Sequence, residues 1–529
     1  MLKSKYIIIL LPLLLSAYSH LWNPLGFPSV HIDEGHYMRR AVMVLEGMGP
    51  QESAATGYPR TYDHPYFGQL FLAALLGTIG YPSSLSPTPD VQSIQLLHLA
   101  PRVLMGLLAV GDTFILYKIA ERRYNTTVAL IASILFAIMP ATWIFRRVYL
   151  DTIFIPFILS SILFAIYLKR PPGSSDSMKL KPNYTISKNV SITISGIFLG
   201  LATYTKIPAI TMIPLVATMI FFNSGKKYRS VAIWVIPVIL LPLLWPLYSV
   251  VIGQNDLWMK WVIWQTERTE SKNITFANAI NNFFKIDPLI TILGIAGIAL
   301  SAIRKDYFLL LWIAPIFIFS YSIQWSQYFH LLPIFPAFCL GAAVLIEYTQ
   351  RIIAKYSSNL LSYGMIIFVA VFGFVSTSML ITLNVNSSYY EIYATISKQL
   401  PTSSNQSNSN ITLIGSHWWV WDSYWITHYV LNKPHYMLDP RFDPKFQEPI
   451  KTEKVLLVED SKFNQSISRK INSENLMQIR EVQNKSKEIA TFVDNVTSYT
   501  RNTYPYNTLP IMISNEDHPI GKVVIKRNY

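Results

Sequence analysis

Long apolar runs separated by short polar segments dominate the first 383 residues. A helix that crosses the hydrocarbon core of a bilayer needs about 17–25 predominantly apolar residues, and most of these runs approach or reach that length. The pattern predicts a mainly α-helical, polytopic membrane protein with about 11 transmembrane helices. The predicted spans are 6–22, 100–119, 127–144, 152–168, 190–204, 207–222, 231–252, 288–303, 307–323, 331–348 and 359–383.

The basic residues between these runs orient the chain in the membrane. Cytoplasmic loops carry an excess of Lys and Arg, and a cytoplasmic N-terminus places most of the basic loops on that side. The first outer loop is then 23–99, and the segment from 384 to the end lies outside the membrane. We therefore expect a multi-pass protein of a cell membrane, or of the endoplasmic reticulum if the source is eukaryotic. The basic clusters are at Lys118–Arg123, Lys169–Arg170, Lys226–Arg229, Arg304–Lys305 and Arg351–Lys355.

Residues 384–529 differ in kind from the rest of the chain. They are rich in Asn and Ser, and their apolar runs are short. Ile411–Gly415 and Lys454–Val458 have the composition of strands, whereas Tyr389–Leu400 and Trp418–Leu431 have that of helices. Such alternation predicts a small extracytoplasmic α/β domain at 384–529, attached to a transmembrane domain at 1–383.

Composition supports this division and removes several classes of function. Of the 529 residues, 51% are hydrophobic and only 14% are charged, whereas an average soluble domain carries about 25% charged residues. The net charge of +14 could mean nucleic acid or an anionic membrane as partner. The position of the basic residues in short loops favours the membrane. The single cysteine, Cys339, excludes a disulfide framework, and the chain has no nucleotide-binding glycine loop and no His-Glu-x-x-His motif.

An acidic pair directly after the first apolar run is the leading candidate for chemistry. Asp33 and Glu34 lie in the segment His31–Tyr37. Ionisable groups at a membrane edge are costly and commonly mark functional sites. On a non-helical segment the two carboxylates point in different directions, and one of them could act as a general base. The alternative is a helix N-cap followed by an amphipathic surface helix from Gly35.

Basic and histidine side chains at the outer ends of other spans could bind an anionic substrate. Arg146 and Arg147 fall outside, against the positive-inside rule, and Asp151 follows them. Arginine holds phosphate bidentately, so a lipid phosphate explains this position, although a local Arg–Asp ion pair is the competing explanation. Further candidates are His64, Arg102, Lys206, Tyr328 and His330. Each of them also has a structural explanation, such as a turn, snorkelling to the membrane interface or an aromatic belt.

Two segments rich in aromatic residues are further candidates for contact with the membrane or a sugar. Trp258, Trp261 and Trp264 recur every three residues, which predicts an amphipathic helix with a tryptophan face on the membrane. The segment His417–Trp425 contains four tryptophans and Asp422, and could bind sugar or form the aromatic core of the outer domain.

Together these motifs resemble the GT-C glycosyltransferases over about residues 1–350. The most similar subgroup is the dolichyl-phosphate-mannose protein mannosyltransferase-like one, which includes the bacterial lipid A aminoarabinose transferases. The resemblance implies transfer of mannose or a similar hexose or pentose from a polyprenyl-phosphate donor to a hydroxyl of a protein or lipid. The transfer would occur on the outer face with inversion at the anomeric carbon.

The resemblance also assigns roles to individual residues. Asp33 would be the base, with Glu34 beside it, and the second-loop aspartate of the family would correspond to Asp151. The His-Pro-Pro stretch of the family matches His64-Pro65, followed here by Tyr66 instead of a second proline. The Thr-Lys-Gly stretch matches Thr205-Lys206, followed here by Ile207, and the Tyr-x-Leu-Pro type of segment is similar to Tyr328–Pro333.

Two other functions are carried forward as alternatives. An oligosaccharyltransferase-like enzyme would account for the tryptophan-aspartate cluster at Trp418–Asp422, although the first loop has Asp-Glu in place of Asp-x-Asp. A transporter or flippase of lipid-linked sugars would place its ionisable residues near the bilayer midplane. The expected partners are the lipid donor, a protein or glycolipid acceptor and membrane lipid, with no nucleic acid. No cofactor is required with certainty, and a divalent metal is left open.

Overall fold

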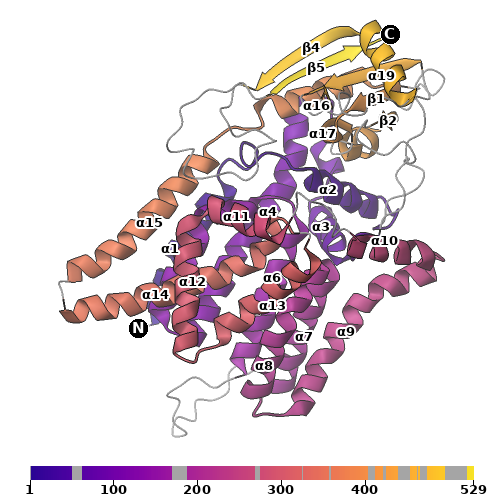
Figure 1. Ribbon diagram of the computed structural model, residues 1–529. Helices are drawn as coiled ribbons and strands as arrows, with labels where there is room; N and C mark the ends of the chain where they lie inside the picture. The colour runs from indigo at the N-terminus through magenta and orange to yellow at the C-terminus, as the bar shows by residue number, and fades with distance from the viewer. Residues whose placement is uncertain are drawn as a thin grey trace.

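A helical region and a smaller mixed domain make up the computed structural model (Figure 1). The structure describes residues 2–50, 62–168, 187–267, 275–324, 326–356, 359–402, 411–420, 424–438, 453–460, 463–464, 474–494 and 521–529. The α-helices of the first region are α1 (Leu2–Leu21), α2 (Ile32–Leu45), α3 (Phe67–Gly77), α4 (Val91–Arg123), α5 (Thr126–Ile138), α6 (Leu150–Tyr167), α7 (Lys188–Thr205), α8 (Ile213–Asn223), α9 (Tyr228–Val251), α10 (Asn255–Glu267), α11 (Phe276–Ile286), α12 (Pro288–Ile303), α13 (Phe308–Ile323), α14 (Phe335–Tyr356) and α15 (Asn359–Ile381). Short 3-10 helices are η2 (Ser83–Leu85), η3 (Pro140–Arg146), η4 (Ile207–Met212) and η6 (Tyr328–Ile334).

Several of these helices have the length and composition of membrane spans. Within the described residues, four helical segments qualify individually, and two bent pairs raise the number to six if each pair is one span. Shorter apolar helices of 10–17 residues account for other predicted runs, so the count of about 11 spans stays a prediction. The helices of the two bent pairs are separated at Met139 and at Asp287.

The helical region has a buried centre and an exposed, apolar periphery. In the most apolar 18-residue stretch of α9, only 22% is buried, whereas 89% of the corresponding stretch of η6 and α14 is buried. Large apolar side chains of α9 such as Leu240 and Leu247 are exposed. Because a water-exposed helix would not carry such a surface, α9 lies at the lipid-facing edge, and η6 with α14 forms the centre.

Glycines allow two pairs of helices to approach closely. A Cβ at Gly297 of α12 would lie 1.8 Å from the carbonyl oxygen of Gly341 in α14. A Cβ at Gly200 of α7 would lie 2.4 Å from the carbonyl oxygen of Pro237 in α9. Small residues at these crossings are the usual means of close helix packing in a membrane.

The C-terminal domain is a mixed α/β unit, as the sequence predicts. Its elements are α16 (Ser387–Gln399), β1 (Ile411–Gly415), α17 (His417–Val420), the π-helix η8 (Trp425–Val430), β2 (Tyr436–Leu438), β3 (Lys454–Glu459), α19 (Glu474–Lys485), β4 (Lys487–Asp494) and β5 (Gly521–Arg527). The strand order is β2-β1-β3-β5-β4. Strand β1 pairs in parallel with β2 and β3, and β5 is antiparallel to both β3 and β4.

This domain sits on the end of the helical region that carries α2 and α3 (Figure 1). The side chain of Asn386 is fully buried at the junction and donates to the carbonyls of Leu25 and Pro28, while its Oδ1 accepts from the Val30 amide at 3.1 Å. The segment before α2 is therefore held between the two domains. The predicted helix at Trp418–Leu431 is two short helices instead, α17 and η8, and residues 421–423 lie outside the described residues.

Candidate active site

The acidic pair lies in the first turn of α2, which corrects the expectation of a non-helical segment. His31 is the N-cap, and its Nδ1 accepts a hydrogen bond from the Asp33 amide at 3.3 Å. In return, Oε1 of Glu34 accepts from the His31 amide at 2.9 Å, which completes a capping box. The helical alternative was nearer to the structure, but the helix begins at Ile32 and not at Gly35. Histidine is not among the usual N-cap residues, which explains why this start is hard to predict.

Glu34 is buried in a bidentate pair with Arg102 of α4. Nη2 of Arg102 lies 2.9 Å from Oε1 of Glu34, and Nε lies 3.1 Å from Oε2. The other guanidinium nitrogen donates to the carbonyls of Pro24 and Pro28, and the Val148 amide donates to Glu34 Oε2 at 3.3 Å. Both side chains are almost fully buried. Glu34 thus joins α2, α4 and the segment before α6.

Asp33 is the most accessible carboxylate of this region. Its side chain is 35% exposed, compared with 4% for Glu34 and 3% for Asp151. Its Oδ2 lies 3.7 Å from Nδ1 of His31. A group that takes a proton from a substrate must be reachable by that substrate, and Asp33 satisfies this condition better than Glu34.

Three carboxylates converge around the buried phenol of Tyr37. Burial raises the pKa of Tyr37 well above its ordinary value. The carboxylates of Asp33, Asp151 and Asp63 raise the same pKa further, whereas Arg40 lowers it. Asp33 and Asp151, which are distant in sequence, thus both affect this pKa, and so does Asp63.

Asp63 organises a second cluster beside Asp33. Nη2 of Arg40 lies 2.6 Å from Asp63 Oδ1, and the Nε2 atoms of His36 and His64 lie 3.4 and 3.9 Å from Oδ2. Burial alone would raise the pKa of Asp63, but Arg40, His64 and His36 outweigh it and hold that pKa well below its ordinary value. The backbone carbonyl of Asp63 also accepts from Gln265 of α10 at 2.8 Å.

The depressed pKa of Asp63 gives a pH-dependent prediction. The carboxylate contributes stability that is fully present above its unfolded pKa of about 4 and is lost only as the pH falls through the lower folded value. Asp63→Asn leaves buried Arg40 without its anion, at a cost of about 3 kcal/mol. We expect a lower thermal midpoint in detergent, with a difference from the wild-type protein that does not shrink between pH 7 and pH 5.

The exposed Asp256 at the start of α10 offers a matched control. Asp256→Asn should leave the midpoint unchanged over the same pH range. A difference between Asp63→Asn and wild type that already shrinks between pH 7 and pH 5 would show that Asp63 is not held charged in this way.

A buried ion pair joins Asp151 at the start of α6 to Lys206 at the end of α7. Nζ of Lys206 lies 2.6 Å from Oδ2 of Asp151, and the ammonium lies 5.6 Å from the centre of the Phe329 ring. The same Phe329 ring packs against His31 and His330, with centroid distances of 6.1 and 4.6 Å. Asp151 therefore pairs with Lys206 and not with the arginines that the competing explanation names, and the pair lies close to the N-terminus of α2.

Arg146 and Arg147 are buried beneath the segment that leads into α2. Nη2 of Arg146 donates to the carbonyl of Trp22 and, at 2.8 Å, to that of Asn23. Arg147 donates to the phenol oxygens of Tyr149 and Tyr328 at 2.8 and 3.2 Å and to the Ser29 carbonyl at 3.1 Å. Both guanidinium groups thus fix protein segments here, and a phosphate-binding role for them stays a prediction.

Tyr328 and His330 are placed by the 3-10 helix η6. Tyr328 is buried, with its phenol oxygen on Arg147, whereas His330 is half-buried and its Nδ1 accepts from the Gln327 amide at 3.1 Å. Of the two, His330 is nearer to a surface that a substrate could reach.

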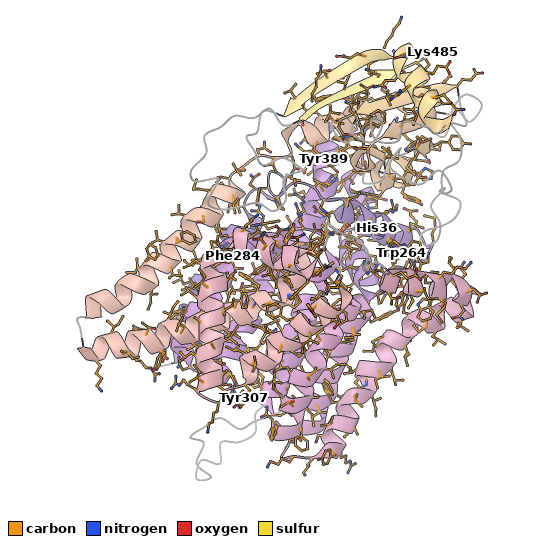
Figure 2. The ribbon with its side chains drawn as sticks, in the orientation of Figure 1. His36, Trp264, Phe284, Tyr307, Tyr389 and Lys485 are labelled. Carbon is orange, nitrogen blue, oxygen red and sulfur yellow. The ribbon has the colours of Figure 1, made fainter. Side chains whose placement is uncertain are left out.

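An aromatic wall borders the site on the side of α9 and α10. Tyr62, Tyr66 and Trp245 are buried together, and Trp258 of α10 packs edge-on against Trp245 at 5.5 Å. The predicted tryptophan helix is thus present as α10, and Figure 2 shows Trp264 on it beside the region of His36. Among the residues that the structure describes, no group of three or more His, Cys, Asp or Glu side chains is arranged to hold a metal ion.

Comparison with solved structures identifies similar molecules. The oligosaccharyltransferase of Archaeoglobus fulgidus with a tethered acceptor peptide containing the NVT sequon is 12% identical; the match covers 98% of this chain and 75% of that one, with a TM-score of 0.55. The oligosaccharyltransferase AglB from Archaeoglobus fulgidus, in complex with an inhibitory peptide and a dolichol-phosphate, gives 12% identity, the same coverage and a TM-score of 0.56. ArnT from Cupriavidus metallidurans bound to undecaprenyl phosphate is 13% identical over 99% of this chain and 98% of that one, with a TM-score of 0.52. No protein-family model matches the sequence. No curated protein matches it either.

Proposed function

We propose that this chain, which has the fold of the GT-C membrane glycosyltransferases, is itself a glycosyltransferase. Its donor would be a sugar carried on a polyprenyl phosphate, and its acceptor a hydroxyl group of a protein or lipid at the outer face of the membrane. The observation that carries the proposal is the placement of Asp33 beside the buried Asp151–Lys206 pair. Asp33 lies 3.7 Å from His31, whose ring packs against Phe329, and the Lys206 ammonium lies over the same Phe329 ring.

Each step of the transfer has a candidate group. An acceptor hydroxyl gives its proton to a carboxylate oxygen of Asp33 as its oxygen forms a bond to the anomeric carbon. The bond from that carbon to the phosphate oxygen breaks, and its electron pair leaves with the polyprenyl phosphate. Stabilisation of charge that develops on the leaving group is commonly the largest catalytic contribution.

Lys206 is the best-placed cation for that leaving group. It is held by Asp151, so its position is fixed before the substrate binds. His64 and His330 are partly exposed near the same site and could donate hydrogen bonds to phosphate or sugar oxygens. We assign Glu34 and Arg102 to positioning, because their pair is buried and joins α2 to α4.

A transfer assay in vesicles tests the proposal. Full-length protein in vesicles would be given a polyprenyl-phosphate-linked radiolabelled monosaccharide, mannose first, together with a Ser/Thr peptide or a glycolipid acceptor. We expect label on the acceptor, free polyprenyl phosphate in equal amount and an inverted anomeric linkage by NMR. Movement of intact donor across the vesicle with no transfer would instead identify a transporter.

An oligosaccharyltransferase is the second candidate, favoured by the likeness to the Archaeoglobus enzyme over nearly the whole chain. The tryptophan-aspartate cluster that resembles that enzyme class includes Asp422, which lies outside the described residues. The same vesicles with a lipid-linked oligosaccharide and an Asn-x-Thr peptide discriminate the two. An asparagine-linked product, dependent on a divalent metal, would replace the monosaccharide proposal.

A further inference from the structure

Two histidines lie side by side in the C-terminal domain, apart from the candidate active site. His428 belongs to the π-helix η8, and His435 directly precedes strand β2 (Figure 1). Their ring centroids are 6.4 Å apart, with an interplanar angle of 65°. Turns of π-helix occur frequently at functional sites, so the pair is a candidate for a role of its own.

Within the described residues, each of these rings has a buried nitrogen without a hydrogen-bond partner. Nδ1 of His435 donates to the carbonyl of Lys433 at 2.9 Å, so in the neutral ring Nε2 carries a lone pair and no proton. This Nε2 atom and Nδ1 of His428 are both buried and unpartnered in the described part of the chain. The two nitrogens therefore point to a ligand that the polypeptide itself does not supply.

His20 shows how a structural histidine of this chain is satisfied. It is fully buried, its Nδ1 lies 2.8 Å from the Ser16 carbonyl oxygen, and its Nε2 lies 2.8 Å from Oγ1 of Thr142. Both of its ring nitrogens are engaged by protein groups, as is usual for buried polar atoms. His428 and His435 depart from this pattern, and they do so next to each other.

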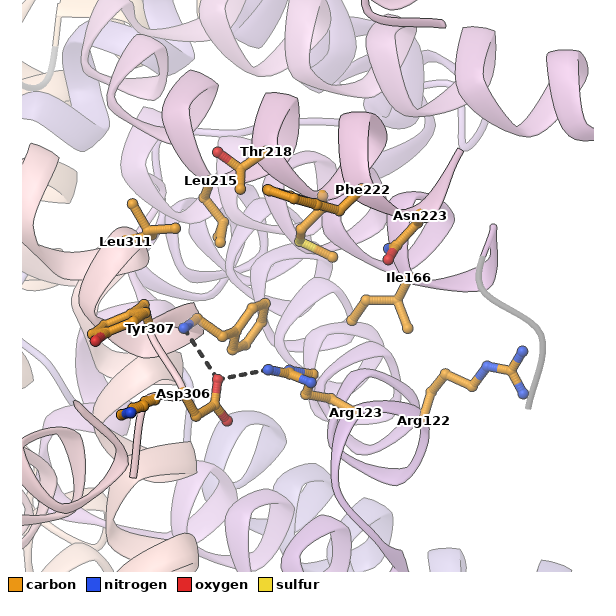
Figure 3. Close-up of a pocket in the computed structure, with 13 residues that line it drawn as sticks. Arg122, Arg123, Ile166, Leu215, Thr218, Phe222, Asn223, Asp306, Tyr307 and Leu311 are labelled. Atoms are coloured by element: carbon orange, nitrogen blue, oxygen red, sulfur yellow. Dashed lines mark hydrogen bonds and ion pairs between the residues drawn. The ribbon is translucent and has the colours of Figure 1, made fainter. Parts of the chain in front are cut away.

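The cavity in Figure 3 provides a second contrast. It has a volume of about 340 Å³ and lies where α4, α6 and α8 end and α13 begins. Nη2 of Arg123 lies 2.6 Å from Oδ1 of Asp306, and the Arg122 guanidinium lies over the Tyr167 ring at 5.5 Å. No described residue that lines it has a buried side-chain nitrogen or oxygen without a partner. Its lining does not indicate a ligand, whereas the two histidines do.

Neutral imidazoles with available nitrogens are ligands for transition metals. Burial lowers the pKa of His428 and lowers that of His435 to about 4; the hydrogen bond to Lys433 raises the latter pKa, and His428 lowers it. Among the described residues, no carboxylate shifts either pKa, so both rings are uncharged at neutral pH. Such nitrogens suit Zn²⁺ and its neighbours in the first transition series, whereas Ca²⁺ and Mg²⁺ take oxygen ligands.

We propose that His428 Nδ1 and His435 Nε2 bind a transition-metal dication, with Zn²⁺ as the representative ion and water in its other coordination positions. The hydrogen bond from His435 Nδ1 to Lys433 is the kind of second-shell contact that fixes the tautomer of a histidine ligand. Zn–N bonds of about 2.0–2.1 Å place the centroids of two ligand rings about 5–5.5 Å apart. The rings, 6.4 Å apart in this structure, therefore approach each other by about 1 Å when the ion binds.

The bound ion has a structural consequence for the outer domain. The buried Tyr424 ring stacks on His428 at 4.5 Å and lies 5.5 Å from the His435 ring, so it supports both ligands. Trp425, the first residue of η8, lines a small gap beside Glu34 of α2. An ion that joins η8 to the segment before β2 stabilises the contact of the outer domain with α2 and does not touch the substrate.

Zinc binding by the full-length protein, purified without a polyhistidine tag, tests the proposal. The protein in detergent is stripped with a chelator and titrated with ZnCl₂ by isothermal calorimetry in excess Mg²⁺. We expect one Zn²⁺ per chain and a higher thermal midpoint, because an ion that binds only the folded state stabilises it. Loss of a second-shell partner alone costs about 10- to 100-fold in affinity, so His428→Gln and His435→Gln should each weaken binding at least about 100-fold.

Two controls separate this site from other histidines. His64→Gln makes the same substitution beside Asp63 and should bind Zn²⁺ like the wild type. Cu²⁺ bound to the wild-type protein reports the ligands without any substitution, and its pulsed EPR spectrum should show two imidazoles.

Four results would overturn the proposal. They are no zinc binding by the wild type, undiminished binding by His428→Gln or His435→Gln, loss of zinc in His64→Gln, and a Cu²⁺ spectrum with fewer than two imidazoles. None of these measurements depends on glycosyltransferase activity.

Discussion

Replacement of Asp33 by asparagine is expected to reduce the rate of sugar transfer about 10²- to 10⁴-fold, the range that a positioned general base contributes. The amide has the size of the carboxylate but cannot take the acceptor proton. Because the Asp33 side chain is 35% exposed and the first-turn hydrogen bond to His31 uses its backbone amide, the fold should be retained. The loss should appear in kcat, since binding of the donor lipid does not require this carboxylate.

The measurement is initial-rate transfer in vesicles, with the thermal midpoint as a check on folding. Glu46→Gln removes an exposed carboxylate from the other end of α2 and serves as the matched control. Normal kcat in Asp33→Asn would remove the proposed base. A change in the KM for the donor with kcat unchanged would instead assign Asp33 to donor binding.

The architecture could be predicted largely from the pattern of apolar residues. Runs of spanning length predict the helical region, and the short apolar runs Ile411–Gly415 and Lys454–Val458 predict two strands that the structure contains as β1 and β3. The GT-C fold, recognised from short motifs, is confirmed by the structural neighbours. Strands β4 and β5 were missed, because their apolar runs are only two or three residues long and are flanked by charged or polar residues.

Several residues of the candidate site could be named from the sequence, but the contacts between them could not. Asp151 and Lys206 were both candidates, yet they lie on different helices, and only the packing of α6 against α7 brings them within 2.6 Å. The sequence pattern points to His64 and not to its neighbour Asp63. The importance of Asp63 depends on His36 and Arg40, which lie one and two turns into α2 and contact it only in the folded chain.

Buried arginines illustrate the same limit of sequence analysis. An arginine at the outer end of a span could bind a lipid phosphate or could hold a neighbouring loop in place. The sequence does not distinguish these two roles. In this structure Arg102 and Arg147 donate to carbonyls of Pro28 and Ser29, just before α2. The N-terminus of α2, and with it Asp33, is thus positioned by side chains from α4 and from the segment after η3.

The Glu34–Arg102 pair yields the largest expected effect on stability. Removal of one partner from a buried ion pair costs about 3–5 kcal/mol, because the other charge stays buried and uncompensated. Glu34→Gln should therefore lower the thermal midpoint in detergent strongly, and Arg102→Gln should do the same. Each variant should also reduce transfer, since the turn that carries Asp33 loses its anchor on α4.

The double variant distinguishes positioning from catalysis by Glu34. Glu34→Gln/Arg102→Gln leaves neither charge buried, so its midpoint should be higher than the sum of the two single losses implies, and transfer should partly return. The double-mutant cycle measures this coupling, with Glu46→Gln as the control for loss of an α2 carboxylate. If Glu34→Gln instead abolished kcat at an unchanged midpoint and the double variant recovered nothing, Glu34 would act on the substrate, because loss of a buried anchor is expected to lower the midpoint as well as the rate.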